Sequence, residues 1–338
     1  MLRSEKAKLG LKFRNKLLNR QIKRKFRGSS IPTEMEEFLP IIDDAYDHYE
    51  ETYRLLNRAL EISSKELNDA KSKLNVTLSN LNEINHDLLS SIHCAKLIQE
   101  AILPSESAIK QVLPESFLFY RPRDIVSGDF YWLEQSGGKI LIAAVDCTGH
   151  GVPGAFMSII GNNQLNATVK EDELTTPGLI LDRLSQGVSD TLSHTTDEEA
   201  GIKDGMDIAL VSIDYEKMIL EYAGAYNPLY IFRDGKLLET KGDKFPIGVS
   251  IDDTLRLFKN HEFELQKGDC VYIFSDGYPD QFGGPRGKKY KYEQFRQLLF
   301  GMHTLPMEEQ KTVMENDFVD WMGELVQLDD VLVIGMRL

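Results

Sequence analysis

The chain has 338 residues, an apolar fraction of 42% and a formal net charge of −14. This length suits two structural units better than one small domain, and no apolar run approaches the roughly 18 to 20 residues of a membrane span. The three cysteines lack CxxC spacing, which excludes a disulfide framework and a zinc knuckle. Because few, unpaired cysteines suit a reducing compartment and no secretory signal pattern is present, we expect a cytoplasmic protein.

Residues 1–32 form a basic N-terminal segment. Residues 1–30 contain eleven Lys/Arg and one Glu, so the remainder of the chain carries a charge of about −24. A largely acidic protein is not expected to bind nucleic acid. The loosely helical spacing of apolar residues in the segment suits a short amphipathic helix that contacts an acidic membrane surface or partner. The alternative is a solvated tail.

A helical linker is predicted over residues 33–104. Thr33 with Glu36 has the pattern of a capping box, which marks a helix start. An apolar residue then recurs at almost every seventh position from Leu39 to Ile102, and a second set follows three places later. This register, held for about nine heptads, predicts a coiled coil.

One long helix cannot bury such a stripe on a small domain, so we expect a homodimer. The alternative is two helices folded into a hairpin, with a break near Ser63 or Asn82.

Residues 105–338 change to short β-rich segments. Runs of strands, two helices, many hairpin-linked strands, two more helices and a final strand follow one another. Such segregated runs predict an α+β fold, an antiparallel β-sandwich flanked by helices. The expected helices span 152–169, 179–192, 292–300 and 307–325, and a strand is expected over 255–265. No GxGxxG or GxxxxGK[ST] motif occurs, so a Rossmann or P-loop nucleotide site is not supported.

Four carboxylate sites lie at the ends of apolar segments. They are Asp129 in VSGDFYW, Asp146 in LIAAVDCTGHG, Asp276 in VYIFSDGYPD and Asp329-Asp330 in LVQLDDVLVIG. If their strands are neighbours, the four converge on one edge of a sheet. Clustered carboxylates repel one another unless cations lie among them, and oxygen ligands without His or Cys clusters favour Mg²⁺ or Mn²⁺. Each Asp taken alone is more often a turn cap.

These motifs, in this order, resemble the metal-dependent PPM-type protein phosphatases and, more narrowly, their bacterial SpoIIE-like branch, from about Ile98 to Leu338. The resemblance implies two Mn²⁺ or Mg²⁺ ions. Their ligands would be Asp129, Asp146, the backbone carbonyl of Cys147, Asp276 and Asp329. A metal-bridging hydroxide would attack phosphoserine or phosphothreonine on a protein. The segment AKLIQEAILP resembles the regulatory switch helix that precedes such domains.

Further site residues follow from the same resemblance. His150 either protonates the leaving serine oxygen or holds its loop, and Arg121 and Arg123 are placed to contact the substrate phosphate. The closing motif of the family commonly reads D-D-x-T, and Leu332 takes the Thr position here. Asp204 and Asp207 are additional acidic residues that we expect to cap a loop.

The usual substrates of this branch resemble small anti-anti-sigma (STAS) proteins, which makes a phosphorylated STAS-type protein the expected partner. Control of the phosphatase domain through the N-terminal helix is expected as well. A different reading is a pseudophosphatase scaffold, inactive or weakly active, that docks partners in a signalling complex. A third, a histidine-kinase-like ATPase, rests only on the GHG turn and the helical linker, and the chain lacks an asparagine-bearing ATP helix.

Overall fold

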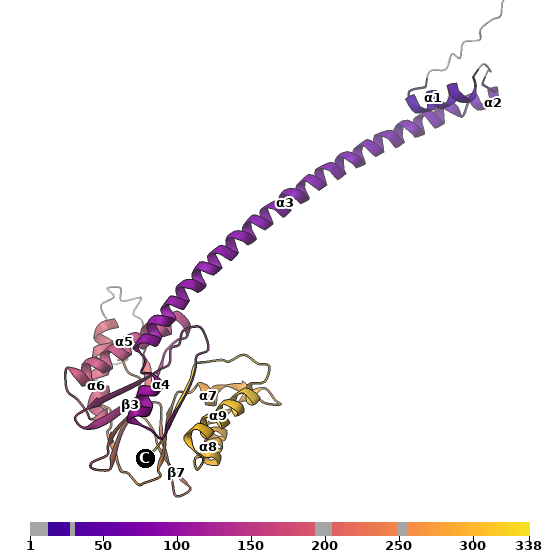
Figure 1. The fold of residues 1–338 in the computed structure, drawn as a ribbon. Coiled ribbons are helices and arrows are strands. Elements are labelled where there is room, and N and C mark those ends of the chain that lie inside the picture. Colours follow the sequence, from indigo (N-terminus) through magenta and orange to yellow (C-terminus); the bar gives the residue numbers. More distant parts are fainter. Residues whose placement is uncertain (1–12, 28–30, 193–204, 249–255) are drawn as a thin grey trace, which may run out of the picture. The chain divides into compact units, whose positions relative to one another are not determined.

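A computed structural model describes residues 13–27, 31–192, 205–248 and 256–338 (Figure 1). Much of the basic segment and Asp204 therefore lie outside the described residues. The chain divides into two compact units, Met1–His86 and Asp87–Leu338, and each is described by itself. Among the helices described, none combines the length and the apolar character that crossing a bilayer requires.

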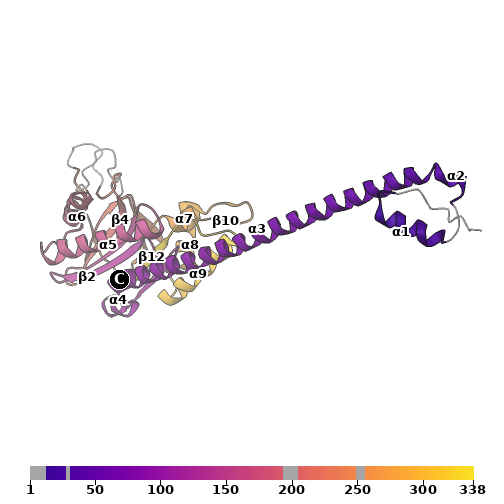
Figure 2. The same ribbon diagram turned by 90° about the horizontal axis from the view of Figure 1, so that it is seen from above.

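The first unit contains α1 (Lys16–Lys25), α2 (Thr33–Glu36) and the first part of α3 (Leu39–Ile102). The amphipathic helix expected in the basic segment is found as α1, which lies beside the start of α3 (Figure 2). Its apolar face packs on α3 through a small cluster of buried residues: Phe13, Leu18, Ile22, Ile31 and Leu39. Asp43 of α3 accepts the backbone N–H of Asn15 at 2.8 Å, which ties the start of α1 to α3.

The helix start predicted at Thr33 is confirmed, since α2 begins there, but the capping box that marked it is not found. Pro32 is the N-cap of α2, and no side chain caps this helix. Thr33 is already the first helical residue, so its hydroxyl does not occupy the N-cap position from which it could accept a first-turn N–H.

The heptad segment forms the single helix α3, with no interruption at Ser63 or Asn82, so the folded-back hairpin is not found. Many apolar side chains at its heptad positions are more than half exposed: Tyr53, Leu56, Leu60, Leu67, Leu74, Leu81, Ile84 and Leu88. Within the described part of this chain nothing covers that apolar stripe. Apolar surface of this extent and regularity is typical of an association surface.

The second unit is a sandwich of two five-stranded antiparallel sheets, as predicted. The first sheet has the order β1 (Ser116–Arg121), β12 (Val331–Arg337), β9 (Cys270–Phe274), β6 (Leu229–Arg233), β7 (Lys236–Thr240). The second has the order β2 (Phe130–Ser136), β3 (Lys139–Cys147), β4 (Met206–Asp214), β5 (Ile219–Ala225), β8 (His261–Glu264). Alternating apolar residues of both sheets, such as Ile142, Val211, Ile273 and Ile334, fill the space between them.

Helices cover both outer faces of the sandwich (Figure 1). The pair α5 (Gly151–Lys170) and α6 (Pro177–Leu192) packs on the second sheet, and the pair α8 (Lys291–Met302) and α9 (Met307–Met322) packs on the first. These helices match the predicted ones to within a few residues. The strand predicted over 255–265 is shorter, because only His261–Glu264 pairs with β5; residue 255 lies outside the described residues.

Three small elements were not predicted from the sequence. They are the helix α4 (Glu106–Val112), the helix α7 (Gly277–Asp280) and the hairpin of β10 (Phe282–Gly283) with β11 (Lys288–Lys289). The hydroxyl of Ser105 caps α4 by accepting the N–H of Ala108, and Ile109 anchors the helix in the core between the sheets. All three are short pieces whose positions depend on tertiary contacts.

Candidate metal centre

The four predicted carboxylates lie in two pairs, one pair on each sheet. Asp129 directly precedes β2 and Asp146 lies near the end of β3, which pair with each other. Asp276 follows β9 and Asp329 precedes β12, which pair in the first sheet. The four strands are therefore not neighbours in one sheet, which was the condition for convergence on a single sheet edge. The pairs meet across the sandwich: Ser275, directly before Asp276, donates to Asp129 at 2.5 Å, and the charge of Asp276 raises the pKa of Asp146.

Burial and mutual repulsion raise the pKa of each of these carboxyl groups. Burial is the largest cause at Asp129 and Asp146, where the pKa lies well above its ordinary value, and neighbouring carboxylates add to it. Burial followed by Asp280 and Asp329 raises the pKa of Asp276 to about 6. The four groups therefore lie within electrostatic range of one another and take up protons unless cations replace them.

Asp207 belongs to the same acidic cluster. It faces Asp146 across the β3–β4 ladder. Burial, with a contribution from Asp276, raises the pKa of Asp207 to about 7. Asp207 lies inside strand β4, so the predicted role as a loop cap is wrong for this residue.

The donor set suits a hard divalent cation. It consists of carboxylate oxygens and backbone carbonyls, which are the ligands that Mg²⁺ and Mn²⁺ prefer. Within the residues that the structure describes, no three His, Cys, Asp or Glu side chains have the compact spacing of a preformed metal site.

Two glycines bring the first two motifs into contact. A Cβ on Gly128 would lie 2.6 Å from the carbonyl oxygen of Gly149 and 3.1 Å from that of Cys147. A Cβ on Gly154 would lie 2.5 Å from the same Gly149 oxygen. The turn before Asp129 therefore fits against the turn after Asp146 only without side chains. The thiol of Cys147 is buried and its pKa is raised, which disfavours the thiolate form that binds metals. The backbone carbonyl of Cys147 is therefore the group that we still predict as a metal ligand.

The two carboxylates of the closing motif have different surroundings. Asp330 is buried, and its two oxygens accept the N–H groups of Arg123 and Gly128, each at 2.7 Å. Asp330 therefore fixes the turn before Asp129 against the start of β12. Asp329 accepts the N–H of Asp330 at 2.9 Å. Its charge raises the pKa of Asp146 and Asp276, whereas at Asp129 the charge of Asp330 has the larger effect of the two.

Ser275 is a site residue that the sequence did not reveal. Its Oγ donates to Oδ2 of Asp129 at 2.5 Å and accepts the N–H of Leu332 at 3.0 Å. Leu332 occupies the usual Thr position, and its own side chain is buried in the core between the sheets. The hydroxyl missing from the closing motif is thus present on the neighbouring strand. Its position directly before Asp276 was the available signal.

His150 forms a pair with Asp124, which was also missed. His150 is the N-cap residue of α5 but makes no side-chain capping bond. Its Nδ1 lies 2.9 Å from Oδ2 of Asp124, and both side chains are about half exposed. The positive form of His150 lowers the pKa of Asp329, so the pair lies beside the carboxylate cluster.

The two predicted phosphate-binding arginines lie in different surroundings. Arg123 adjoins the cluster, since its guanidinium donates to the carbonyl of Leu328 and its charge lowers the pKa of Asp329. Arg121 lies toward α9, where its Nε donates to Gln327 at 2.8 Å and its guanidinium lies 5.5 Å from the ring centre of Phe318.

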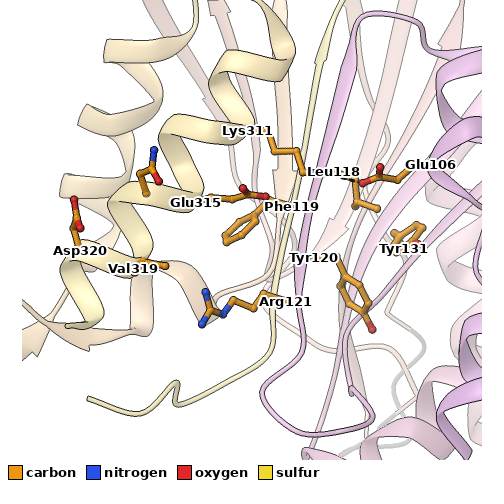
Figure 3. Close-up of a pocket in the computed structure, with 11 residues that line it drawn as sticks. Glu106, Leu118, Phe119, Tyr120, Arg121, Tyr131, Lys311, Glu315, Val319 and Asp320 are labelled. Carbon is orange, nitrogen blue, oxygen red and sulfur yellow. Dashed lines mark hydrogen bonds and ion pairs between the residues drawn. The ribbon is translucent and has the colours of Figure 1, made fainter. Parts of the chain in front are cut away.

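Arg121 lines a cavity of about 650 Å³ between β1 and α9 (Figure 3). None of the four predicted metal carboxylates lines this cavity. Its polar lining combines both signs of charge, from Glu106, Arg121, Lys311, Glu315 and Asp320. The role of either arginine toward phosphate remains a prediction.

Comparison with known proteins finds relatives of this chain in sequence and in structure. The SiaA-PP2C domain of Pseudomonas aeruginosa is 32% identical with a TM-score of 0.67, covering 75% of this chain and 98% of that domain. Phosphoserine phosphatase RsbU of Bacillus subtilis is 24% identical over 200 residues, 58% of this chain and 56% of RsbU. The chain therefore spans about half the length of this curated relative.

A further solved structure shares the fold. It contains the PP2C phosphatase domain of SpoIIE from Bacillus subtilis with a fragment of its regulatory domain, and is 19% identical with a TM-score of 0.53, covering 66% of this chain and 61% of that one. Residues 136–338 match the family model of Stage II sporulation protein E. Because that match covers more than half of the chain, and the fold and motif order agree with it, the protein belongs to the SpoIIE family of PPM-type phosphatase domains.

Proposed function

We propose that this protein is a metal-dependent protein serine/threonine phosphatase in bacterial signalling. The observation that carries the proposal is the meeting of two carboxylate pairs, one from each sheet, in a buried cluster whose pKa values are raised. Bound cations would relieve the mutual repulsion of such a cluster. The likeness to a phosphoserine phosphatase and to a PP2C domain supports the same activity.

Asp129, Asp146, Asp276 and Asp329, with the carbonyl of Cys147, would hold two Mn²⁺ or Mg²⁺ ions. When bound, the ions supply a water activated for in-line attack and neutralise the charge of the phosphate. Ser275 keeps the carboxylate of Asp129 in one orientation through its hydrogen bond. Arg123, beside Asp329, is placed to contact the phosphate.

His150 is the proposed proton donor. The leaving serine oxygen needs a proton as the P–O bond breaks. The imidazole lies at the edge of the cluster and Asp124 contacts its Nδ1, which leaves Nε2 as the nitrogen that would give the proton. Asp124 would set the ring orientation, as carboxylates commonly do for catalytic histidines.

The substrate we propose is a phosphorylated regulatory protein of the STAS type, which the resemblance to the SpoIIE-like branch implies. The exposed heptad stripe of α3 supports a homodimer, and we propose that α3 regulates the phosphatase domain. Contact of the basic N-terminal segment with an acidic membrane surface is a further proposal, which rests on charge alone.

Purified full-length protein tests the activity. We expect it to hydrolyse a phosphoserine peptide in the presence of Mn²⁺ and to lose that activity in EDTA. Asp146→Asn should lower turnover by about 100-fold or more, since it removes a metal ligand. Absence of hydrolysis by the unmodified protein, with no change on Asp146→Asn, would instead support the pseudophosphatase scaffold.

A further inference from the structure

Gln99 lies near the end of α3 and is buried, whereas the residues next to it on the helix are exposed. Its side chain is 3% exposed, whereas that of Leu97 on the same turn is 66% exposed. A buried primary amide costs free energy unless its donors and acceptor are satisfied. A buried glutamine at this position is therefore stable only if its amide forms hydrogen bonds.

Three hydrogen bonds satisfy the amide of Gln99. Nε2 donates to the carbonyl of Ser127 at 2.7 Å and to Oγ of Ser158 at 2.8 Å, and Oε1 accepts the N–H of Ser127 at 3.1 Å. The backbone N–H of Ser127 can only donate, so it fixes which end of the amide faces it. The hydroxyl of Ser158 in turn donates to the carbonyl of Ala155 within α5.

These partners belong to the two motifs that frame the metal centre. Ser127 lies two residues before Asp129, and its Oγ accepts the N–H of Asp129 at 3.1 Å. Ser158 lies on α5, the helix that begins directly after the turn from Asp146 to His150. One side chain is therefore bonded both to the support of Asp129 and to the helix that follows Asp146.

We infer that Gln99 is a positioning residue for the metal centre: its amide holds the turn at Ser127 against α5, so that Asp129 and Asp146 face each other at the separation the ions require. This inference rests on the proposed function, since it names a determinant of cation affinity at the same site. Gln99 touches neither ion nor substrate. Partners of this kind commonly change metal affinity by about 10- to 100-fold when they are removed.

The packing alone does not account for an amide at this position. An apolar side chain of similar size, such as leucine, would fill the same space and leave the helix intact. It would, however, lose all three bonds and free the turn before Asp129 from α5. A purely structural role and a positioning role therefore predict different effects on metal binding.

Isothermal titration of the full-length protein with Mn²⁺ tests the inference. Gln99→Leu should bind Mn²⁺ about 10- to 100-fold more weakly, while Glu100→Gln, an exposed neighbour on the same turn, should bind it as the unmodified protein does. Thermal unfolding without metal shows whether each variant is folded. Turnover of a phosphoserine peptide by Gln99→Leu should approach the unmodified kcat once Mn²⁺ is saturating, because only the positions of the ligands are affected.

Ser158→Ala is the second variant, in case Gln99→Leu fails to fold. It removes only the bond to α5 and should weaken Mn²⁺ binding in the same direction by a smaller factor. Unchanged Mn²⁺ affinity in the folded variants, with active unmodified protein, overturns the role of Gln99 and leaves the proposed function standing. An unmodified protein that neither binds Mn²⁺ nor hydrolyses the peptide overturns both.

Discussion

The hydroxyl of Ser275 donates a 2.5 Å hydrogen bond to Oδ2 of Asp129, from one sheet of the sandwich to the other. Both side chains are buried, and the same hydroxyl accepts the N–H of Leu332. The bond therefore links a carboxylate of the second sheet to a paired strand segment of the first. It places a hydroxyl, from the residue that follows β9, beside Leu332, at the position where the D-D-x-T pattern has Thr.

Replacement of Ser275 by Ala removes this link and leaves the N–H of Leu332 without its partner. We expect a loss of about 1 to 3 kcal/mol in the free energy of unfolding, the usual effect of an unsatisfied buried group. Mn²⁺ binding should weaken as well, because Asp129 loses its orientation. Urea unfolding and calorimetric titration measure the two effects. Ser275→Thr retains the hydroxyl and serves as the control, and a Ser275→Ala variant with unaltered Mn²⁺ affinity would contradict the role.

The metal-free protein should become less stable as the pH rises from about 4 to 7. The pKa of Asp276 is about 6 and that of Asp207 about 7 in the folded protein, against an ordinary value of 3.8. Because the folded state holds these protons more tightly than the unfolded state, their contribution is full below pH 3.8 and is lost as the pH passes through the raised values.

Denaturant unfolding in EDTA at a series of pH values measures this dependence. Asp207→Asn should show a shallower decline, and Mn²⁺ should remove most of the decline because cations neutralise the carboxylates. The interpretation would be abandoned if the unmodified protein in EDTA and Asp207→Asn had the same pH dependence.

Cysteines at Leu74 or Leu81 should form disulfide-linked dimers if α3 pairs with a second copy in parallel register. Both side chains lie at heptad positions and are well exposed in the single chain. Cys94 is exposed and must first be replaced by Ser, so that it cannot crosslink by itself. Non-reducing electrophoresis detects the product, and a cysteine at exposed Glu83, outside both heptad sets, is the control. Equal crosslinking at Glu83, or none at the heptad positions, would argue against a parallel coiled coil.

Asp124→Asn should lower turnover of a phosphoserine peptide more than turnover of p-nitrophenyl phosphate. The serine oxygen needs a proton to leave, whereas p-nitrophenolate leaves readily without one, so loss of the contact to His150 matters only for the first. We expect a decrease of about 10- to 100-fold for the peptide, less than the roughly 100- to 10,000-fold contribution of a general acid, because Asp124 acts only through His150. His150→Ala should show the same preference. Equal losses on both substrates would assign the pair a structural role.

Much of the sandwich follows from local patterns in the sequence. Strands such as β3 and β4 are apolar runs bounded by turn residues, and α5, α6, α8 and α9 were predicted to within a few residues because their length and boundaries carry strong signals. The hairpin of β10 and β11 has only two residues in each strand and is held to α9, where Gly284 donates its N–H to the carbonyl of Trp321. No periodicity can form in so few residues.

For the candidate site, too, the residues with a local sequence pattern could be predicted and those defined by distant contacts could not. Asp129, Asp146, Asp276 and Asp329 could be named because each ends or precedes an apolar segment. Ser275, Asp124 and Gln99 could not, because their partners lie 146, 26 and at least 28 residues away in the chain. Whether the carboxylates share one sheet edge could not be predicted for a related reason, since strand order is decided by non-local pairing and not by the segments themselves.

Because the carboxylates come from both sheets, a bound ion would join the two sheets at one end of the sandwich. An ion that binds the folded chain alone stabilises it by about 2.7 kcal/mol at a concentration 100 times its dissociation constant. The free energy of unfolding then rises and falls with free cation. The fraction of protein open to proteases would report the supply of Mn²⁺ or Mg²⁺ directly, so that the lifetime of the protein and its catalytic competence would depend on the same ions.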